Sequence, residues 1–106
     1  MADVRNVEFA EALSALQPLL GAEIRVMFHF YETLCGGYLE GPLVRVETTA
    51  PGDPGVNLVI GEKGGVLLDP EGLEEIHLAG DLEAGGFLSF YLLRHVEISI
   101  SRVPGS

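Results

Sequence analysis

The sequence predicts a mainly β protein in which an N-terminal helix precedes a strongly bent antiparallel sheet, or small partly open barrel, of five or six strands. Three observations lead to this prediction. Apolar residues recur with helical spacing in one segment, residues 6–20. From residue 22 onward the apolar residues alternate with a period of two, which is typical of strands. The 14 glycines and 6 prolines are numerous enough for the tight turns that such a sheet needs.

The chain has 106 residues, which is about one domain with one modest core. Hydrophobic residues make up 47% and charged residues 21%, a globular rather than a disordered composition. We therefore expect a single domain over residues 1–106. Its parts are a helix at 6–20, the strands of a small barrel at 22–79, and a long C-terminal strand at 87–101.

The predicted helix has an apolar face with spacings of four, three and four residues. That face carries Phe9, Leu13, Leu16 and Leu20. Pro18 has no N–H to donate to a helical hydrogen bond, so the helix should end or kink near Gln17. Gly21 is a suitable stop signal just beyond it.

The first strand of the predicted barrel begins at Ala22 and has one strongly apolar face. Ile24, Val26, Phe28 and Phe30 share that face, and Arg25, Met27, His29 and Tyr31 share the other. A turn at residues 33–37 leads to a second strand over residues 38–49. Gly41-Pro42 interrupts this second strand, and we expect a bulge or sharp bend there.

Three shorter strands follow, at residues 56–60, 66–68 and 73–78, and Gly- or Pro-containing turns separate them. The alternation in the last of these strands is imperfect, which allows a 3₁₀ turn at residues 73–75. Because the connections are short, consecutive strands should be neighbours in the sheet.

The segment 87–101 alternates along its whole length. Leu88, Phe90, Leu92, Val96, Ile98 and Ile100 share one face, while the opposite face begins with Phe87, Tyr91 and Leu93. Its first half is thus apolar on both faces, and both should be covered by this chain or by another copy. Fifteen extended residues span about 50 Å, so the strand must bend, break or reach a neighbour. We predict an oligomer interface at Phe87, Tyr91 and Leu93.

The charge balance disfavours nucleic acids and anionic membranes as partners. Sixteen acidic residues against six basic ones give a formal net charge of −10, and the basic residues form no run. Such a chain repels nucleic acids and anionic membranes at long range. Cys35 is the one cysteine, so no internal disulfide can form. No stretch has the pattern of a secretory signal or a membrane helix, and we expect a cytoplasmic protein.

The residues that could carry chemistry are few. His29, Tyr31 and Cys35 lie close together, and a Cys–His pair can activate a thiolate or bind zinc. No CxxC, HxH or HExxH spacing supports either role, so we predict no catalytic residues, no metal and no cofactor. His95 and Glu97 are two residues apart on the same predicted face and should form a surface pair.

Four stretches resemble the Sm-like family. They are residues 16–21 followed by Ile24-Arg25-Val26-Met27-Phe28, then Gly37-Tyr38-Leu39-Glu40-Gly41, then Asn57-Leu58-Val59-Ile60, and finally residues 67–78. The resemblance covers residues 6–79 and implies a five-stranded bent barrel that assembles into a ring. That family's RNA site needs a stacking aromatic and a basic turn. Here Asp53-Pro54-Gly55-Val56 precedes Asn57, and the later turn is Asp69-Pro70-Glu71-Gly72, so Asn57 alone carries over.

These observations favour a non-catalytic interaction or assembly module that forms homo-oligomers or docks on a protein partner. Two alternatives remain open. One is an Sm-like RNA-binding protein, and the other is a small ligand- or metal-binding domain that uses His29, Cys35 and nearby carboxylates. The candidate binding residues are His29, Tyr31 and Asn57.

Overall fold

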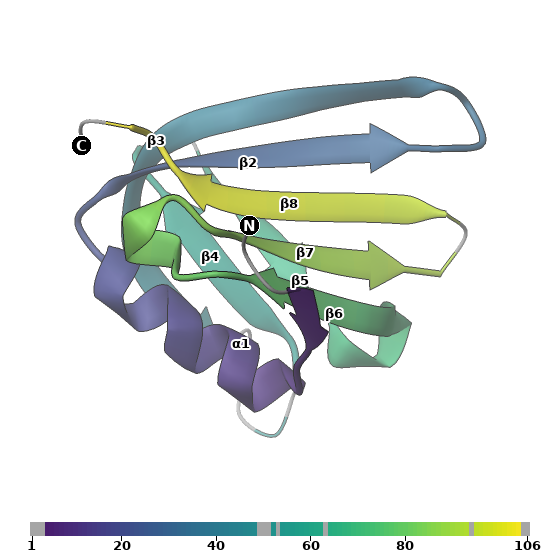
Figure 1. Cartoon of the computed structure of the whole chain (residues 1–106), viewed down its shortest axis with the longest axis horizontal. Coiled ribbons are helices and arrows are strands. Elements are labelled where there is room, and N and C mark those ends of the chain that lie inside the picture. Colours follow the sequence, from purple (N-terminus) through teal and green to yellow (C-terminus); the bar gives the residue numbers. More distant parts are fainter. Residues whose placement is uncertain (1–3, 49–51, 53, 63, 94, 105–106) are drawn as a thin grey trace.

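The computed structural model describes residues 4–48, 52, 54–62, 64–93 and 95–104. In these residues, one α-helix packs against the inner face of a curled, eight-stranded antiparallel sheet (Figure 1). The strands lie in the order β1-β6-β7-β8-β2-β3-β4-β5. The elements are β1 (Val4–Asn6), α1 (Phe9–Leu16), η1 (Gln17–Leu19), β2 (Glu23–Phe30), β3 (Cys35–Thr48), β4 (Val56–Ile60), β5 (Gly64–Leu68), η2 (Pro70–Gly72), β6 (Leu73–Ala79), η3 (Leu82–Ala84), β7 (Phe87–Leu92) and β8 (Val96–Arg102). The predicted fold class is confirmed, with more strands than the five or six expected.

Helix α1 is shorter than predicted. Residues 4–6 form β1, which pairs with β6 through Val4 opposite Ala79, so the helix begins only at Phe9. Pro18 ends the α-helix near Gln17 as expected, because the chain continues there as the 3₁₀ turn η1. No helix among the described residues has the length and apolar character required to cross a bilayer.

Strand β3 changes its partner halfway along its length. Its first part pairs with β2 from Cys35 to Pro42, and its second part pairs with β4 from Leu43 to Thr48. The register shifts between Leu43 and Arg45, so the predicted irregularity near Gly41-Pro42 is confirmed. A Cβ at Gly41 would lie 3.0 Å from Ile60 Cγ2, which shows how closely β3 approaches the end of β4.

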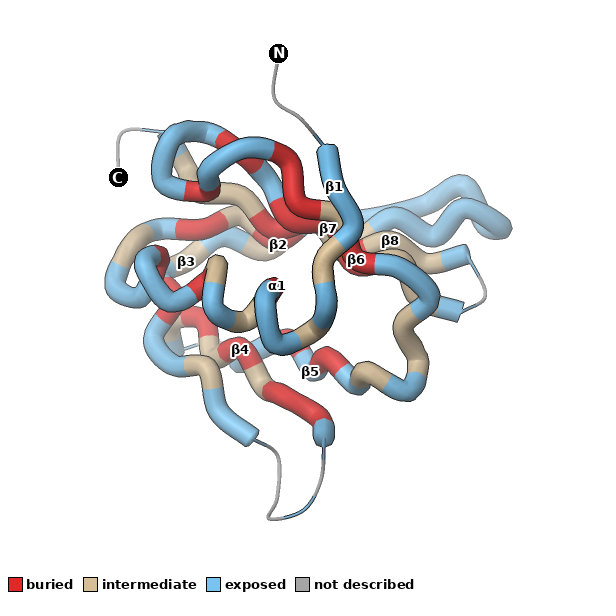
Figure 2. The backbone as a smooth tube through the Cα atoms, turned by 60° about the horizontal axis from the view of Figure 1, so that its bottom comes forward, coloured by how far each residue is buried: buried red, intermediate tan, exposed pale blue. Residues whose placement is uncertain are grey.

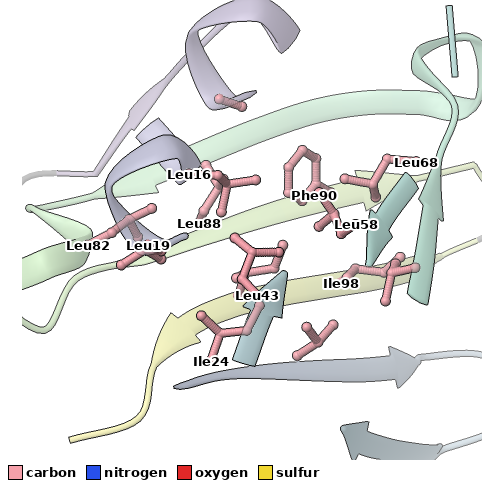
Figure 3. Packing of buried hydrophobic residues seen from close by; sticks show 14 of the residues in the cluster. Leu16, Leu19, Ile24, Leu43, Leu58, Leu68, Leu82, Leu88, Phe90 and Ile98 are labelled. Carbon is pink, nitrogen blue, oxygen red and sulfur yellow. The ribbon is translucent and has the colours of Figure 1, made fainter. Parts of the chain in front are cut away.

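The hydrophobic core lies between α1 and the inner face of the curled sheet (Figure 2). In Figure 3, side chains from the helix and from strands on both sides of the β3 partner change converge on one cluster. Its fully buried members include Leu16, Leu19, Ile24, Val26, Leu43, Leu58, Leu68, Leu88, Phe90 and Ile100. The sheet therefore curls so that β4 and β5 share one core with β7, β8 and β2.

The prediction of one long strand over 87–101 is wrong. The segment forms a hairpin of β7 and β8, in which Leu92 pairs with Val96. A strand of about 50 Å would exceed the 36 Å longest extent of the molecule. His95 adopts a left-handed φ of 61° in the turn, a conformation in which histidine is enriched. The predicted faces are correct, because Leu88, Phe90, Ile98 and Ile100 are buried.

The end of the barrel segment also differs in detail. The 3₁₀ turn lies at η2, before the strand rather than at residues 73–75. The imperfect alternation reflects a register shift between Leu73 and Glu75 where β6 pairs with β7. Residue 49, the predicted end of the second strand, lies outside the described residues.

Phe90 and Phe87 provide a matched test of this core, because they lie on opposite faces of β7. Phe90 is fully buried and Phe87 is 42% exposed. Phe90→Ala should lower the free energy of unfolding by about 3–5 kcal/mol through lost burial and a cavity. Phe87→Ala should cost about 1 kcal/mol or less. Urea denaturation measures both, and equal losses would contradict the assignment of the two faces.

Candidate functional site

The side chains of most chemical interest lie on the face of β6, β7, β8, β2 and β3 that points away from α1, here called the outer face. The ladder registers place the following residues on it: Glu75 and His77; Phe87, Ser89 and Tyr91; Glu97, Ser99 and Ser101; Arg25, Met27 and His29; and Gly36, Tyr38 and Glu40. No helix or strand among the described residues packs over this face (Figure 1).

Glu97 is the centre of a hydrogen-bonded cluster on the outer face. The Tyr31 hydroxyl donates to Glu97 Oε1, and Ser99 Oγ donates to Glu97 Oε2 over 3.1 Å. Ser89 Oγ lies 2.9 Å from Ser99 Oγ and acts as the donor, because the Ser99 proton is already used. Ser89 is fully buried although it belongs to the outer face. We call Tyr31, Ser89, Tyr91, Glu97 and Ser99 the Glu97 cluster.

Two histidines flank this cluster, one on each side. The His29 ring stacks on Tyr31, with centroids 4.1 Å apart and planes 13° apart. The His77 ring lies 4.8 Å from Tyr91 at 56°, and its Nε2 is 3.0 Å from Glu75 Oε2. The ladder brings His29 opposite Glu97, Glu97 opposite Tyr91 and Tyr91 opposite Glu75. These four side chains form an aromatic and acidic row that crosses β6, β7, β8 and β2.

The cluster holds its groups in their ordinary charge states. Burial alone raises the pKa of Glu97, but hydrogen bonds from Tyr31 and Ser99 outweigh it, so the pKa is lowered overall. The bond to Glu97 raises the pKa of Tyr31 to about 12. Burial and the Glu97 charge raise the pKa of Tyr91. The carboxylate is thus a weak base and the phenols are weak acids near neutral pH, where a general acid or base works best with a pKa near 7.

The predicted binding residues are only partly brought together. His29 and Tyr31 stack on each other beside Glu97. Asn57 lies on β4, opposite Glu47 and Leu67, in the other half of the sheet. Sequence reasoning missed the cluster's centre because Tyr31 and Glu97 are 66 residues apart, and the sequence carries no signal that β2 and β8 are neighbours.

Cys35 and His95 lie outside the Glu97 cluster. Cys35 is exposed, with Sγ 2.9 Å from Thr33 Oγ1. The expected His95–Glu97 pair is wrong, because His95 Nε2 lies 3.8 Å from Glu32 Oε1 instead and its left-handed φ turns it out of the ladder. Within the described ranges, no three His, Cys, Asp or Glu side chains are grouped closely enough to hold a metal ion.

The predicted interface residues lie along β7 and the turn after it. Phe87 and Tyr91 share the outer face, where Phe87 is 42% exposed and Tyr91 packs against His77. Leu93 is 54% exposed, and its N–H donates to the carbonyl of Gly72 over 2.9 Å. Whether these three residues contact another molecule stays a prediction.

A second group of exposed apolar side chains lies on the β2–β3 hairpin, whose turn extends past the buried core (Figure 2). We call this group the hairpin patch: Met27, Phe30, Tyr31, Leu34 and Tyr38, which are 51%, 39%, 43%, 87% and 71% exposed. A surface hollow of about 430 Å³ runs beside it, lined by Met27, His29, Leu34, Gly36 and Tyr38 among others. The sequence predicted the faces of β2 but not this concentration of exposed apolar residues.

Comparison with known proteins gave no match among family models, curated proteins or solved structures. The resemblance to the Sm-like family therefore stays a prediction, and function has to be argued from the surface itself.

The Glu97 cluster predicts a specific dependence on alkaline pH. Because the folded-state pKa of Tyr31 is raised from 10.0 to about 12, its contribution to stability is complete below pH 10 and is lost as the pH rises toward 12. Glu97→Gln should bring the Tyr31 titration back toward pH 10 in ultraviolet phenolate absorbance. Glu47→Gln, which removes a carboxylate from the β3–β4 ladder, should leave it unchanged. An unaltered titration in Glu97→Gln would refute the hydrogen bond as the cause.

Proposed function

We propose that this chain is a non-catalytic interaction module that assembles with copies of itself through the hairpin patch. The observation that carries the proposal is the exposure of five large apolar or aromatic side chains together on one protruding hairpin. Met27 and Tyr38 are cross-strand neighbours on the outer face, and Phe30 lies on the other face of the same hairpin. Single exposed apolar residues are normal in proteins, but several of them gathered on one hairpin are typical of an interaction site.

The chemistry of the outer face supports a binding role over catalysis. The hydroxyls of Tyr31 and Ser99 are engaged as donors to Glu97, and that of Ser89 is engaged with Ser99. A nucleophilic hydroxyl needs a neighbouring base that can accept its proton at working pH. Glu97 has a lowered pKa and already accepts several hydrogen bonds, so it does not meet this need.

The conformation of Leu34 also supports a contact at the hairpin turn. Leu34 has a left-handed φ of 53°, which costs a residue with a Cβ about 1 kcal/mol or more. Its side chain is 87% exposed, so no burial within the chain compensates for that cost. Burial against a second molecule would compensate for it.

The charges favour a protein partner over a polyanion. Among the described residues, Arg5, Arg25 and Arg45 each lie against a glutamate: Glu11 at 2.5 Å, Glu40 at 2.5 Å and Glu47 at 3.3 Å. Three of the chain's six cationic side chains are thus paired with carboxylates, and the net charge of −10 opposes the binding of a polyanion. The exposed free thiol of Cys35 suits a reducing compartment, and we place the module in the cytoplasm.

Light scattering coupled to size-exclusion chromatography tests the proposal. The unsubstituted chain should show a mass above its 11.4 kDa monomer that rises with concentration. Tyr38→Glu should shift the mass to that of the monomer, because it places a charge in the centre of the hairpin patch. A chain that stays monomeric at every concentration would refute self-assembly.

Two control variants locate the contact. Leu67→Glu alters a side chain on β5 that is 58% exposed, away from the patch, and should leave the mass unchanged. Phe87→Glu alters the interface predicted from the sequence. If Phe87→Glu dissociates the assembly and Tyr38→Glu does not, the contact lies on β7 and the hairpin patch is the wrong surface.

Leu34→Gly separates stability from assembly. Glycine adopts a left-handed φ without steric cost, so this variant should be as stable as the unsubstituted chain, or more stable by up to about 1 kcal/mol. It should also associate more weakly, because it removes the most exposed apolar side chain of the patch. Thermal unfolding of dilute monomer and light scattering measure the two effects. A stable variant with unchanged assembly would remove Leu34 from the contact.

A further inference from the structure

The first half of β3 is an open sheet edge. Residues 35–40 pair with β2 on one side, while β4 pairs with β3 only from Leu43 onward. The described residues supply no second neighbour for this stretch, and in Figure 1 it runs along the margin of the molecule. We infer that two copies join here, β3 against β3 and antiparallel, around a two-fold axis at Gly37. This inference rests on the proposed self-assembly and specifies its geometry.

This edge lacks the features that protect the β1 edge from pairing. The edge strand β5 (Gly64–Leu68) also carries no charge or proline, and it serves below as the control edge. Proteins protect sheet edges with short strands, charges, prolines or bulges. The β1 edge is three residues long and carries Arg5. In β3, the proline and the register shift come only at Pro42 and beyond. The one charged residue in the open stretch is Glu40, and Arg25 Nε of the same chain lies 2.5 Å from its carboxylate.

The open stretch is complementary to itself. Around a two-fold axis normal to the sheet, the two residues that lie opposite each other point to the same face. Because side chains alternate between faces along a strand, the residue numbers of such a pair are both even or both odd. Centring the axis on Gly37 places Tyr38 of each copy opposite Gly36 of the other. It also places Cys35 of each copy opposite Leu39 of the other. Large side chains thus meet small ones on both faces, and an aromatic ring covers bare glycine backbone across the strands.

The hollow beside the hairpin patch fits this register. A Cβ at Gly36 would lie 2.3 Å from the Phe28 carbonyl oxygen, so this position requires glycine and stays without a side chain. The resulting hollow of about 430 Å³ extends to Met27, His29 and Leu34. In the inferred register, Tyr38 of the second copy lies opposite Gly36 and next in line after His29, where its ring enters that hollow.

Charge and size are consistent with a second copy as the occupant. Two chains of net charge −10 repel each other, but among the described residues no aspartate or glutamate lines the hollow, and Glu40 is paired. The exposed parts of Met27, Leu34 and Tyr38, with the strand backbone, amount to on the order of 1,000 Å² over two copies, and edge-to-edge pairing buries only part of this area because Met27 and Tyr38 stay on the outer face. The dimer should therefore be reversible and depend on concentration.

A two-fold axis normal to the sheet leaves the outer faces of the two copies on the same side of one continuous sheet. The two Glu97 clusters then face the same direction, and the aromatic and acidic row of one copy continues across Gly36 to Tyr38 of the other. The dimer thus presents a single, doubled outer face.

Site-specific cross-linking tests the register. Each variant carries Cys35→Ser, which keeps a group able to bond Thr33. Gly37→Cys adds a thiol where a Cβ meets nothing within 4 Å. On the axis, its Cα lies about 5 Å from its mate, within the range for a disulfide. Tyr38→Cys and Leu67→Cys serve as matched controls, one for a neighbouring register and one for the edge of β5. Light scattering before oxidation checks that each variant still associates, since Tyr38→Cys also removes the ring inferred to enter the hollow.

The expected result is that air oxidation with a copper catalyst converts most of the Gly37→Cys chain to a disulfide dimer, and the two controls much less. The native Cys35 pair should not cross-link, since four residues of offset separate its members by about 13 Å. If light scattering shows a dimer but Tyr38→Cys or Leu67→Cys cross-links in preference to Gly37→Cys, the inferred register is wrong while self-assembly stands. If no dimer exists, the proposed function fails with it.

Hydrogen exchange on the unsubstituted chain tests the same edge without any substitution. Amides of residues 35–40 that point away from β2 are exposed to solvent in the monomer and should exchange several-fold more slowly at high protein concentration. The corresponding amides of β5 should exchange at the same rate at both concentrations. Protection that appears on β5 instead, or on neither edge, would overturn the inference.

Discussion

The change of partner along β3 is the constraint on which the rest of the structure depends. Pairing with β2 before Pro42 and with β4 after it lets one strand belong to both halves of the sheet. The close approach at Gly41 allows Ile60 to pack there, and the sheet can then curl so that β4 and β5 share a core with β7 and β8. The same change of partner leaves residues 35–40 with a free edge.

The outer face has a polar, hydrogen-bonded centre between its exposed apolar residues. Ser89 and Ser99 are small and bond to each other, while Tyr31 reaches Glu97 from the turn after β2. These side-chain hydrogen bonds link β2, β8 and β7 in addition to the backbone hydrogen bonds of the sheet. They also keep Glu97 ionised and the phenols neutral. These shifts move the pKa values of Glu97, Tyr31 and Tyr91 away from neutrality.

The sequence predicted what depends on the local pleat and missed what depends on distant pairing. Alternation placed Ile24 and Val26 on the inner face, and Leu88 and Phe90 likewise, because a period of two reports a face whichever strand is the neighbour. It missed the β7–β8 turn, because the residue with the left-handed φ there is His95 and not a glycine, which would have indicated a turn. It identified His29 and Tyr31 as candidates but not Glu97 as their partner, because strand order is not encoded in either strand alone.

Gly36 and Gly37 are neighbours on the open edge of β3, but the fold restricts the two positions differently. At 36, glycine is required because the Phe28 carbonyl oxygen occupies the place of a Cβ. At 37, a Cβ would meet nothing within 4 Å, so packing within the chain gives no reason for glycine there. In the inferred dimer this position lies on the two-fold axis, and an antiparallel pair accepts a glycine or a small side chain there, so Gly37→Cys can report the register without blocking the pairing. Gly36 is thus the glycine that the fold itself requires, while position 37 accepts a side chain and lies where the two inferred copies meet.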